Sequence, residues 1–269
     1  MYVELLQRFL GVPLSDGGEI FRMFAQLPGA VAAQGKRPLE RYVYVPGTRA
    51  DRVLLVAHAD TVWDKAYGKP AQTTVQFENG VFSGTNEQCG IGADDRAGCA
   101  MLWALRDSGH SLLVVDGEES GKRGAAFLRR SNLPLYRQLN KHRFMIELDW
   151  QGTGTCLYNQ VDNTAQFKEY IAKTLGAKED DFNGGCDLQV LCDAVCGVNL
   201  GVGYHQFHRP GETLCLNEWE QTLKQLQKFL QQEHPRFCIP IRKRMARYLR
   251  MFRTKAKLIL RKLCGRARK

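Results

Sequence analysis

Residues 52–58 read RVLLVAH, a run that is apolar almost throughout and ends at a histidine. A strand with this composition is typical of a parallel sheet that helices cover on both faces. The runs SLLVVDGEE (111–119) and RFMIELD (143–149) have the same character and end in acidic residues. Stretches of helical periodicity, such as residues 95–105 and 164–175, alternate with these strands. The pattern predicts an α/β layer structure with a largely parallel sheet.

His58 and Asp60 stand two positions apart at the end of the first of these strands, in HADTV (58–62). Alternate residues of a strand point to the same side, so the carboxylate lies close enough to hold the imidazole. Such a contact fixes one tautomer, which both a metal-binding histidine and a general base require. A polar strand end facing solvent explains the pair equally well. The rest of the chain has to decide.

Polar side chains also follow the other predicted strands. Open α/β sheets bind ligands beyond the carboxyl ends of their strands, so these side chains are expected to converge. The stretch GIGADDRAG (90–98) adds two aspartates at the start of a predicted helix, where helix capping is the simpler explanation. Zinc accepts imidazole and carboxylate ligands, and a carboxylate can bridge two ions. Taken together the set predicts a metal site, and its members are His58, Asp60, Asp94, Asp95, Glu118, Glu119, Asp149 and His208.

The chain has 269 residues and nine cysteines, none of them in a close CxxC pair. Its first residues contain an acid and no basic segment of the kind that opens a signal peptide. No apolar run reaches membrane-spanning length. We therefore expect reduced thiols and a cytoplasmic protein.

The formal net charge of +10 is unevenly distributed. Residues 241–269 hold thirteen Lys and Arg and no acid, which leaves 25 basic and 28 acidic residues in the rest of the chain. We expect one domain at 1–236, which carries the predicted metal site, and a basic tail at 237–269, which forms an amphipathic helix. Its predicted apolar stripe is Ile241, Met245, Tyr248, Leu249, Phe252, Ile259, Leu260 and Leu263.

The tail has two interpretations. Its stripe packs on the surface of the domain itself, or the tail binds an anionic partner. An anionic membrane surface suits such a helix. Nucleic acid or another polyanion ranks lower, because Tyr248 and Phe252 are the only aromatic side chains in residues 241–269 that can stack on bases.

The ordered motifs HADTV, GADDRAG, DGEESG, IELD and YHQFHRPGE resemble the zinc-dependent exopeptidases with two co-catalytic metals. This superfamily includes leucyl aminopeptidases, tripeptide aminopeptidases, glutamate carboxypeptidases and related deacylases. The resemblance covers about residues 1–233 and implies a mixed, mainly parallel sheet between helices. Only 58 positions lie between Asp149 and His208, too few for the dimerisation domain that many relatives insert there.

The resemblance implies two zinc ions per chain. It makes His58 and Asp149 ligands of one ion and Glu119 and His208 ligands of the other. Asp94 would bridge both ions, and in the family a cis peptide bond usually follows this residue.

The resemblance also implies the catalytic roles. Glu118 would be the general base, and Asp60 the carboxylate that orients His58. His205 is placed near substrate, as the less suitable alternative to His208 for a metal ligand. Asp187 either meets a substrate amino group at the rim of the site or is structural.

The implied activity is hydrolysis of short peptides, most simply by an aminopeptidase. Removal of an acyl group from an N-acyl amino acid and carboxypeptidase activity are alternatives on the same fold. Glutaminyl cyclisation needs one zinc and leaves the pair of His58 and Asp60 unexplained. A non-enzymatic alternative is an inactive basic adaptor that binds an anionic surface through its tail. The intact ligand set, together with Glu118, argues against that loss of activity.

Overall fold

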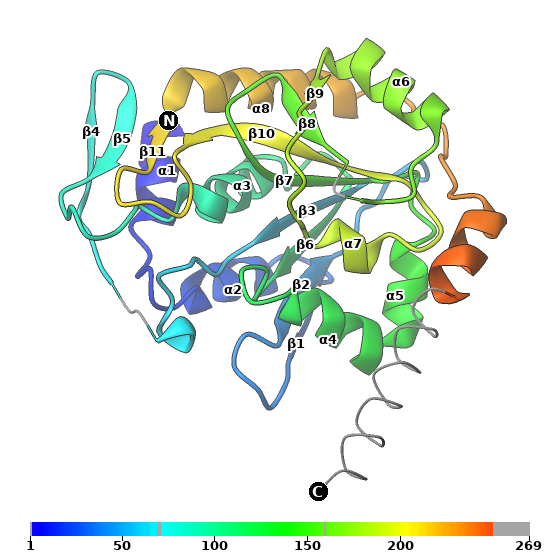
Figure 1. The fold of residues 1–269 in the computed structure, drawn as a ribbon, viewed down its shortest axis with the longest axis horizontal. Helices are drawn as coiled ribbons and strands as arrows, with labels where there is room; N and C mark the ends of the chain where they lie inside the picture. Colours follow the sequence, from blue (N-terminus) through cyan, green and yellow to red (C-terminus); the bar gives the residue numbers. More distant parts are fainter. Residues whose placement is uncertain (1, 69–70, 159, 250–269) are drawn as a thin grey trace, which may run out of the picture.

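The protein is seen here as a computed structural model, which describes residues 2–68, 71–158 and 160–249 (Figure 1). An 11-stranded sheet in this part of the chain has the order β1-β2-β6-β3-β7-β10-β11-β5-β4, with β8 paired to β10 and β9 paired to β8. The strands are β1 Val31–Gln34, β2 Arg41–Val45, β3 Leu54–His58, β4 Val75–Glu78, β5 Val81–Gly84, β6 Ser111–Val115, β7 Met145–Gln151, β8 Thr155–Leu157, β9 Lys178–Glu179, β10 Gly197–His205 and β11 Thr213–Cys215.

The centre of the sheet is parallel. Strand β3 pairs in parallel with β6 on one side and β7 on the other, and β7 pairs in parallel with β10. Every residue of β3 is buried, as its continuous apolar sequence predicts. Both margins, β1-β2-β6 and β10-β11-β5-β4, are antiparallel. The predicted α/β fold with a mixed sheet between helices is confirmed, with its parallel strands at the centre.

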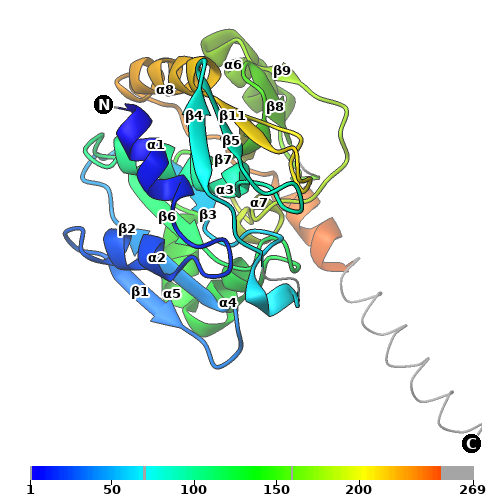
Figure 2. The same cartoon turned by 90° about the vertical axis from the view of Figure 1, so that its left-hand side faces the viewer.

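Helices cover both faces of this sheet (Figures 1 and 2). Strand β2 shows the two layers. Tyr42 packs against Phe127 of α4 with 5.9 Å between ring centroids, whereas its neighbour Arg41 lies 4.3 Å over the ring of Phe21 in α2. The helices are α1 Tyr2–Leu10, α2 Gly18–Ala25, α3 Ala93–Ala104, α4 Arg123–Ser131, α5 Leu133–Leu139, α6 Ala165–Leu175, α7 Leu188–Leu191 and α8 Leu216–Leu230, with a short 3-10 helix η1 at Lys65–Tyr67.

Helix α3 packs closely on the parallel strands. A side chain at Gly98 would collide with the carbonyl oxygen of Leu148 in β7, so the glycine permits the close approach. The far end of the helix is held by aromatic contacts, including Phe24 against Trp103 at 5.3 Å. The indole N–H of Trp219 donates to the carbonyl of Ala97 at 3.0 Å. This packing fixes the start of α3 beside the carboxyl ends of β3 and β7.

The segment between Asp149 and His208 belongs to the same layers. Its described residues, 150–158 and 160–207, contain β8, α6, β9, α7 and β10, which pair or pack with the central sheet or with its helices. These residues form no separate inserted domain. None of the helices in the described ranges combines the length and apolar composition that crossing a bilayer requires.

Packing continues beyond the predicted domain boundary at residue 236. The amide of Phe237 donates to the carbonyl of Arg143, and that of Ile239 to the carbonyl of Ala194. Ile239 is buried. The described chain then forms a helix over residues 241–249. The rest of the predicted tail helix, including Phe252, Ile259, Leu260 and Leu263, lies outside the described residues.

The helix at 241–249 faces the domain with its basic side. Arg244 and Arg247 form ion pairs with Asp193 at 2.8 and 2.7 Å, and the hydroxyl of Tyr248 donates to the same carboxylate at 2.8 Å. The same helix exposes Ile241, Met245 and Leu249 by 74%, 57% and 57%. The interpretation that the stripe packs on the domain is therefore wrong for these three side chains. Tyr248, predicted to share the stripe, instead binds Asp193.

A buried neutral histidine gives the fold a defined acid sensitivity. The two ring nitrogens of His142 contact the carbonyl of Leu139 and the hydroxyl of Ser111 at 2.9 and 2.8 Å. In the neutral ring one nitrogen donates and the other accepts, and both contacts are satisfied. Burial lowers the pKa of His142 to about 4. The unfolded chain takes up this proton at a pKa of about 6.5, so protonation favours unfolding in the window between these values.

We expect His142 to contribute a loss of about 2 kcal/mol in unfolding free energy between pH 7 and pH 5. Urea unfolding at both pH values measures it. His142→Gln keeps one donor and one acceptor but cannot titrate, and should lose about 2 kcal/mol less than the wild type over this interval. Equal losses in the two proteins would show that His142 is not the acid-sensitive group.

Candidate metal centre

The predicted ligands converge at the carboxyl edge of the parallel strands. His58 ends β3, Asp149 lies near the end of β7, and the turn after β6 carries Glu118 and Glu119. The loop after β10 carries His208, and Asp94 lies at the start of α3. Because the strands run in parallel, their carboxyl ends meet at one edge, where open α/β sheets bind ligands.

Asp94 faces a different histidine with each oxygen. Its Oδ1 lies 3.3 Å from Nε2 of His58, which is also 3.4 Å from Oδ1 of Asp149. Its Oδ2 lies 3.2 Å from Nε2 of His208, which is 2.7 Å from Oε1 of Glu119. One carboxylate thus joins two groups of ligands.

These separations fit tetrahedral zinc. Two ligand atoms, each about 2 Å from such an ion, are about 3.3 Å apart. His58, Asp94 and Glu119 offer ligand atoms that all lie within 4.8 Å of one another. The donor set is imidazole and carboxylate, which zinc accepts. The described residues therefore fit a divalent cation, and Asp94 faces both groups of ligands.

The electrostatics of the cluster also suit cations. Burial alone would lower the pKa of His58, yet the charge of Asp149 and its hydrogen bond raise it well above the usual value. Contacts to Asp94 and Glu119 outweigh burial at His208 and raise its pKa to about 10. Burial, reinforced by the charge of Asp94, raises the pKa of Glu119 to about 7. Without metal, protons on the imidazoles balance the carboxylates. Metal ions would replace these protons.

Asp60 connects the end of β3 with the turn after β6. Its Oδ1 lies 3.3 Å from Nδ1 of His58 and accepts the backbone N–H of Glu118 at 3.2 Å. Its Oδ2 accepts the N–H of Glu119 at 3.3 Å and the hydroxyl of Tyr67 at 2.7 Å. One buried carboxylate therefore orients the imidazole and holds the backbone of both glutamates. Tyr67, at the end of η1, was not anticipated from the sequence, because a single tyrosine in so short a helix has no distinguishing pattern.

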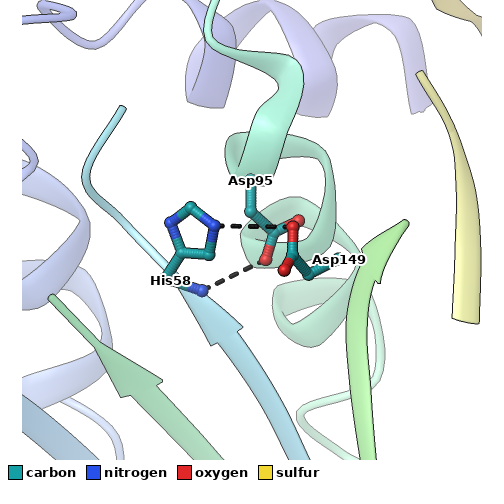
Figure 3. Close-up of side chains that lie close together, drawn as sticks. All are labelled: His58, Asp95 and Asp149. Atoms are coloured by element: carbon teal, nitrogen blue, oxygen red, sulfur yellow. Dashed lines mark hydrogen bonds and ion pairs between the residues drawn. The ribbon is translucent and has the colours of Figure 1, made fainter. Parts of the chain in front are cut away.

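Asp95 lies beside the cluster but is used by the backbone. Figure 3 shows it close to His58 and Asp149. Its Oδ2 accepts the N–H of His58 at 3.1 Å and its Oδ1 the N–H of Gly98 at 3.0 Å. Both oxygens of Asp95 hold backbone groups, whereas those of Asp94 face His58 and His208. The peptide bond between the two aspartates is cis, as the resemblance implies.

Two further buried residues position the ligands. Glu212 accepts the backbone N–H groups of Gly92 and Asp94 at 2.7 and 2.9 Å. The hydroxyl of Tyr204 donates to Oδ1 of Asp149 at 3.1 Å. Glu212 is the last residue of the motif YHQFHRPGE, which does not say what its side chain contacts. Its contact spans 118 positions of the chain, which no local pattern can reveal.

Glu118 lies in a cavity of about 210 Å³ beside the ligands. It is buried, contacts no predicted ligand, and forms an ion pair with Lys122 at 3.3 Å. One wall is aromatic: Phe182 stacks on Trp150 at 4.9 Å, and Phe207 contacts both rings. The cavity thus combines a cluster of polar groups with an apolar wall, which is typical of ligand sites.

The two predicted substrate residues do not line this cavity. His205 lies outside it, with Nε2 2.9 Å from Oε2 of Glu218. Asp187 is fully buried rather than at the rim, and its backbone N–H donates to Glu147 at 3.1 Å. Neither residue enters the function proposed below.

No protein-family model matches the sequence, and a search of curated proteins finds no relative. Solved structures match over most of the chain. Aminopeptidase PepT from Bacillus cereus has a TM-score of 0.62 at 14% identity, with 85% of this chain and 97% of that one covered. A tripeptidase from Staphylococcus aureus has a TM-score of 0.60 at 14% identity, with 85% and 96% covered.

A structure described as an endoglucanase, from Thermotoga maritima, matches with a TM-score of 0.52 at 12% identity, with 84% and 96% covered. Identities this low show the fold and leave the activity to the residues of the site. The fold that the resemblance implies is confirmed: the chain has the fold of the aminopeptidase and the tripeptidase.

Proposed function

We propose that the protein is a zinc-dependent hydrolase of peptide bonds in short peptides, most simply an aminopeptidase that uses two zinc ions per chain. One observation carries the proposal. One oxygen of Asp94 faces His58 and the other faces His208. The carboxylate of Glu118, which is not a predicted metal ligand, lines the same cavity as Asp94. Two-metal hydrolases require a bridging ligand together with a separate proton acceptor.

The residues divide into two ligand groups. His58 and Asp149 would hold one ion, Glu119 and His208 the other, and Asp94 both. When bound, such ions acidify a water molecule and stabilise negative charge on the carbonyl oxygen under attack.

The remaining chemistry belongs to the protein. Glu118 accepts the proton of the attacking water and passes it to the leaving amine. Asp60 keeps Glu118 in place through its backbone N–H. The apolar wall of Trp150, Phe182 and Phe207 keeps water from part of the cavity and offers a surface to a substrate side chain.

A peptide panel tests this function and its alternatives. Zinc-loaded protein is incubated with free, N-acylated and C-amidated short peptides and with N-acyl amino acids, and the products are identified by mass spectrometry. Release of the N-terminal residue from free peptides supports an aminopeptidase. Cleavage confined to N-acylated substrates, or release of only the C-terminal residue, would assign the deacylase or the carboxypeptidase alternative. Cytoplasmic location stays a prediction.

We also propose that the tail attaches the enzyme to an anionic membrane surface. Asp193 holds the basic side of the helix at 241–249, so Ile241, Met245 and Leu249 form a stripe on its outer side. Residues 250–269 add nine Lys and Arg and no acid to the sequence after it. An exposed apolar stripe next to excess positive charge matches the interface of an anionic bilayer.

We expect the full chain to float with vesicles that contain phosphatidylserine and to be released by salt, because charge attraction supplies part of the binding. Serine at Ile241, Met245 and Leu249 together should weaken vesicle binding at least about tenfold and leave peptide hydrolysis unchanged. Leu133→Ser removes an exposed apolar side chain elsewhere and is the matched control. Unchanged flotation of the triple variant, or binding to RNA but not to vesicles, would contradict membrane attachment.

A further inference from the structure

Lys122 lies directly behind the predicted general base. Its Nζ is 3.3 Å from Oε1 of Glu118, and its side chain is 18% exposed. A side chain at Gly185 would meet this Nζ at 2.6 Å, and Gly185 and Glu118 both line the cavity. The ammonium group therefore lies directly behind two lining residues of the cavity, between Glu118 and the loop of Gly184 and Gly185.

This lysine is distinctive in charge and in backbone. The cavity lining in the described ranges contains no lysine or arginine. Within those ranges Glu118 is the one carboxylate within ion-pair distance of Lys122. An ammonium has three N–H donors, so one such contact leaves donors for another anion. The residue has a φ of 62°, a conformation in which glycine is less strained, so the backbone of the turn does not account for a lysine here.

The chemistry of the leaving group says which anion this is. Glu118 must contact the leaving nitrogen in order to protonate it. When a dipeptide is cleaved, that nitrogen belongs to a free amino acid, and its carboxylate carbon lies about 2.5 Å from the nitrogen. A cation 3.3 Å from Glu118 is then within reach of this carboxylate. In a longer or amidated peptide a neutral amide occupies the same place.

Building on the proposed hydrolase function, we propose that Lys122 binds the carboxylate of the leaving amino acid. This contact directs the enzyme to substrates in which the leaving residue carries the free C-terminal carboxylate, dipeptides above all. Burial alone would lower the pKa of Lys122, but the charge of Glu118 and its hydrogen bond outweigh burial and raise this pKa, so the lysine stays protonated. The site is thus specific for a terminal carboxylate, which the predicted metal ligands do not select.

Steady-state kinetics on the dipeptide Leu-Gly and its C-terminal amide test this role. Wild-type zinc-loaded protein should prefer the free acid by about 10- to 100-fold in kcat/KM, the value of a hydrogen bond to a charged group. Lys122→Met should abolish the preference, because kcat/KM for the free acid falls much further than kcat/KM for the amide, chiefly through a higher KM for the free acid. Lys122→Arg should restore part of it. Lys168→Met, which breaks a lysine–glutamate pair outside the cavity, is the matched control.

The outcomes separate the hypotheses. Equal loss of kcat on both substrates in Lys122→Met would show that the lysine only positions Glu118, and would overturn carboxylate recognition. Equal wild-type hydrolysis of acid and amide would overturn it as well, while leaving the peptidase function intact. Absence of hydrolysis of both substrates and of all longer peptides by zinc-loaded protein would overturn the proposed function itself.

Discussion

Glu118→Gln is expected to fold, to bind metal like the wild type and to lose about 10²- to 10⁴-fold in kcat, the usual cost of removing a general base. The carboxylate contacts no predicted ligand, so the change should leave the metal groups intact. Glutamine is similar in size to glutamate, and the backbone N–H of residue 118 still donates to Asp60. Peptide hydrolysis, metal content and circular dichroism measured together check all three expectations.

The neighbouring glutamate provides the matched control. Glu119→Gln removes a predicted ligand 2.7 Å from His208, so it should weaken metal binding first and lose activity through that loss. Added zinc should restore part of the activity of Glu119→Gln and none of that of Glu118→Gln. If Glu118→Gln were instead the variant that emptied the site, the roles of the two glutamates would have to be exchanged.

Asp94→Ala should have the largest effect on metal content. Because one oxygen faces His58 and the other faces His208, a single substitution removes a ligand from both groups. We expect both ions to be lost at micromolar zinc and activity to fall by more than about 100-fold. Asp107→Ala removes a carboxylate that is 86% exposed and should change neither property. Loss of one ion with the second retained would contradict the bridge.

Part of the fold could be predicted from local sequence. The segment at 52–58 is recognisable because a strand between two others and two helical layers is buried at every position, as Leu54–His58 is, and therefore mostly apolar. Strand β1 has no such signal, since VAAQ lies at the edge and is mostly exposed. Helices α4 and α5, nine and seven residues long, are too short for a clear period. These elements depend on tertiary contacts that a local pattern does not contain.

The site divides in the same way. His58 and Asp60 could be paired because strand periodicity acts over two residues. The bonds from Asp60 to the backbone of Glu118 and Glu119 span 58 and 59 positions, so only the folded chain shows them. For a related reason, the sequence did not reveal Lys122. Its importance comes from its distance to Glu118 across a turn and from the nearby Gly185.

In the tail, the spacing of the apolar residues was recognised, but the interpretation that these residues pack on the domain was wrong. Ile241, Met245 and Leu249 recur every fourth residue and share one exposed face. Tyr248 is close to the same spacing, but its hydroxyl reaches Asp193, which also pairs with two arginines. Sequence periodicity identified the stripe and could not say which side of the helix meets the domain.

Zinc titration of metal-free protein during peptide hydrolysis tests the central claim most directly. Chelator-treated protein should be inactive, and stepwise zinc addition should restore cleavage of a free short peptide until about two ions are bound per chain. Isothermal calorimetry under the same conditions counts the ions independently. Full activity with a single tightly bound ion, or two bound ions without cleavage of any peptide, would contradict a two-zinc peptidase.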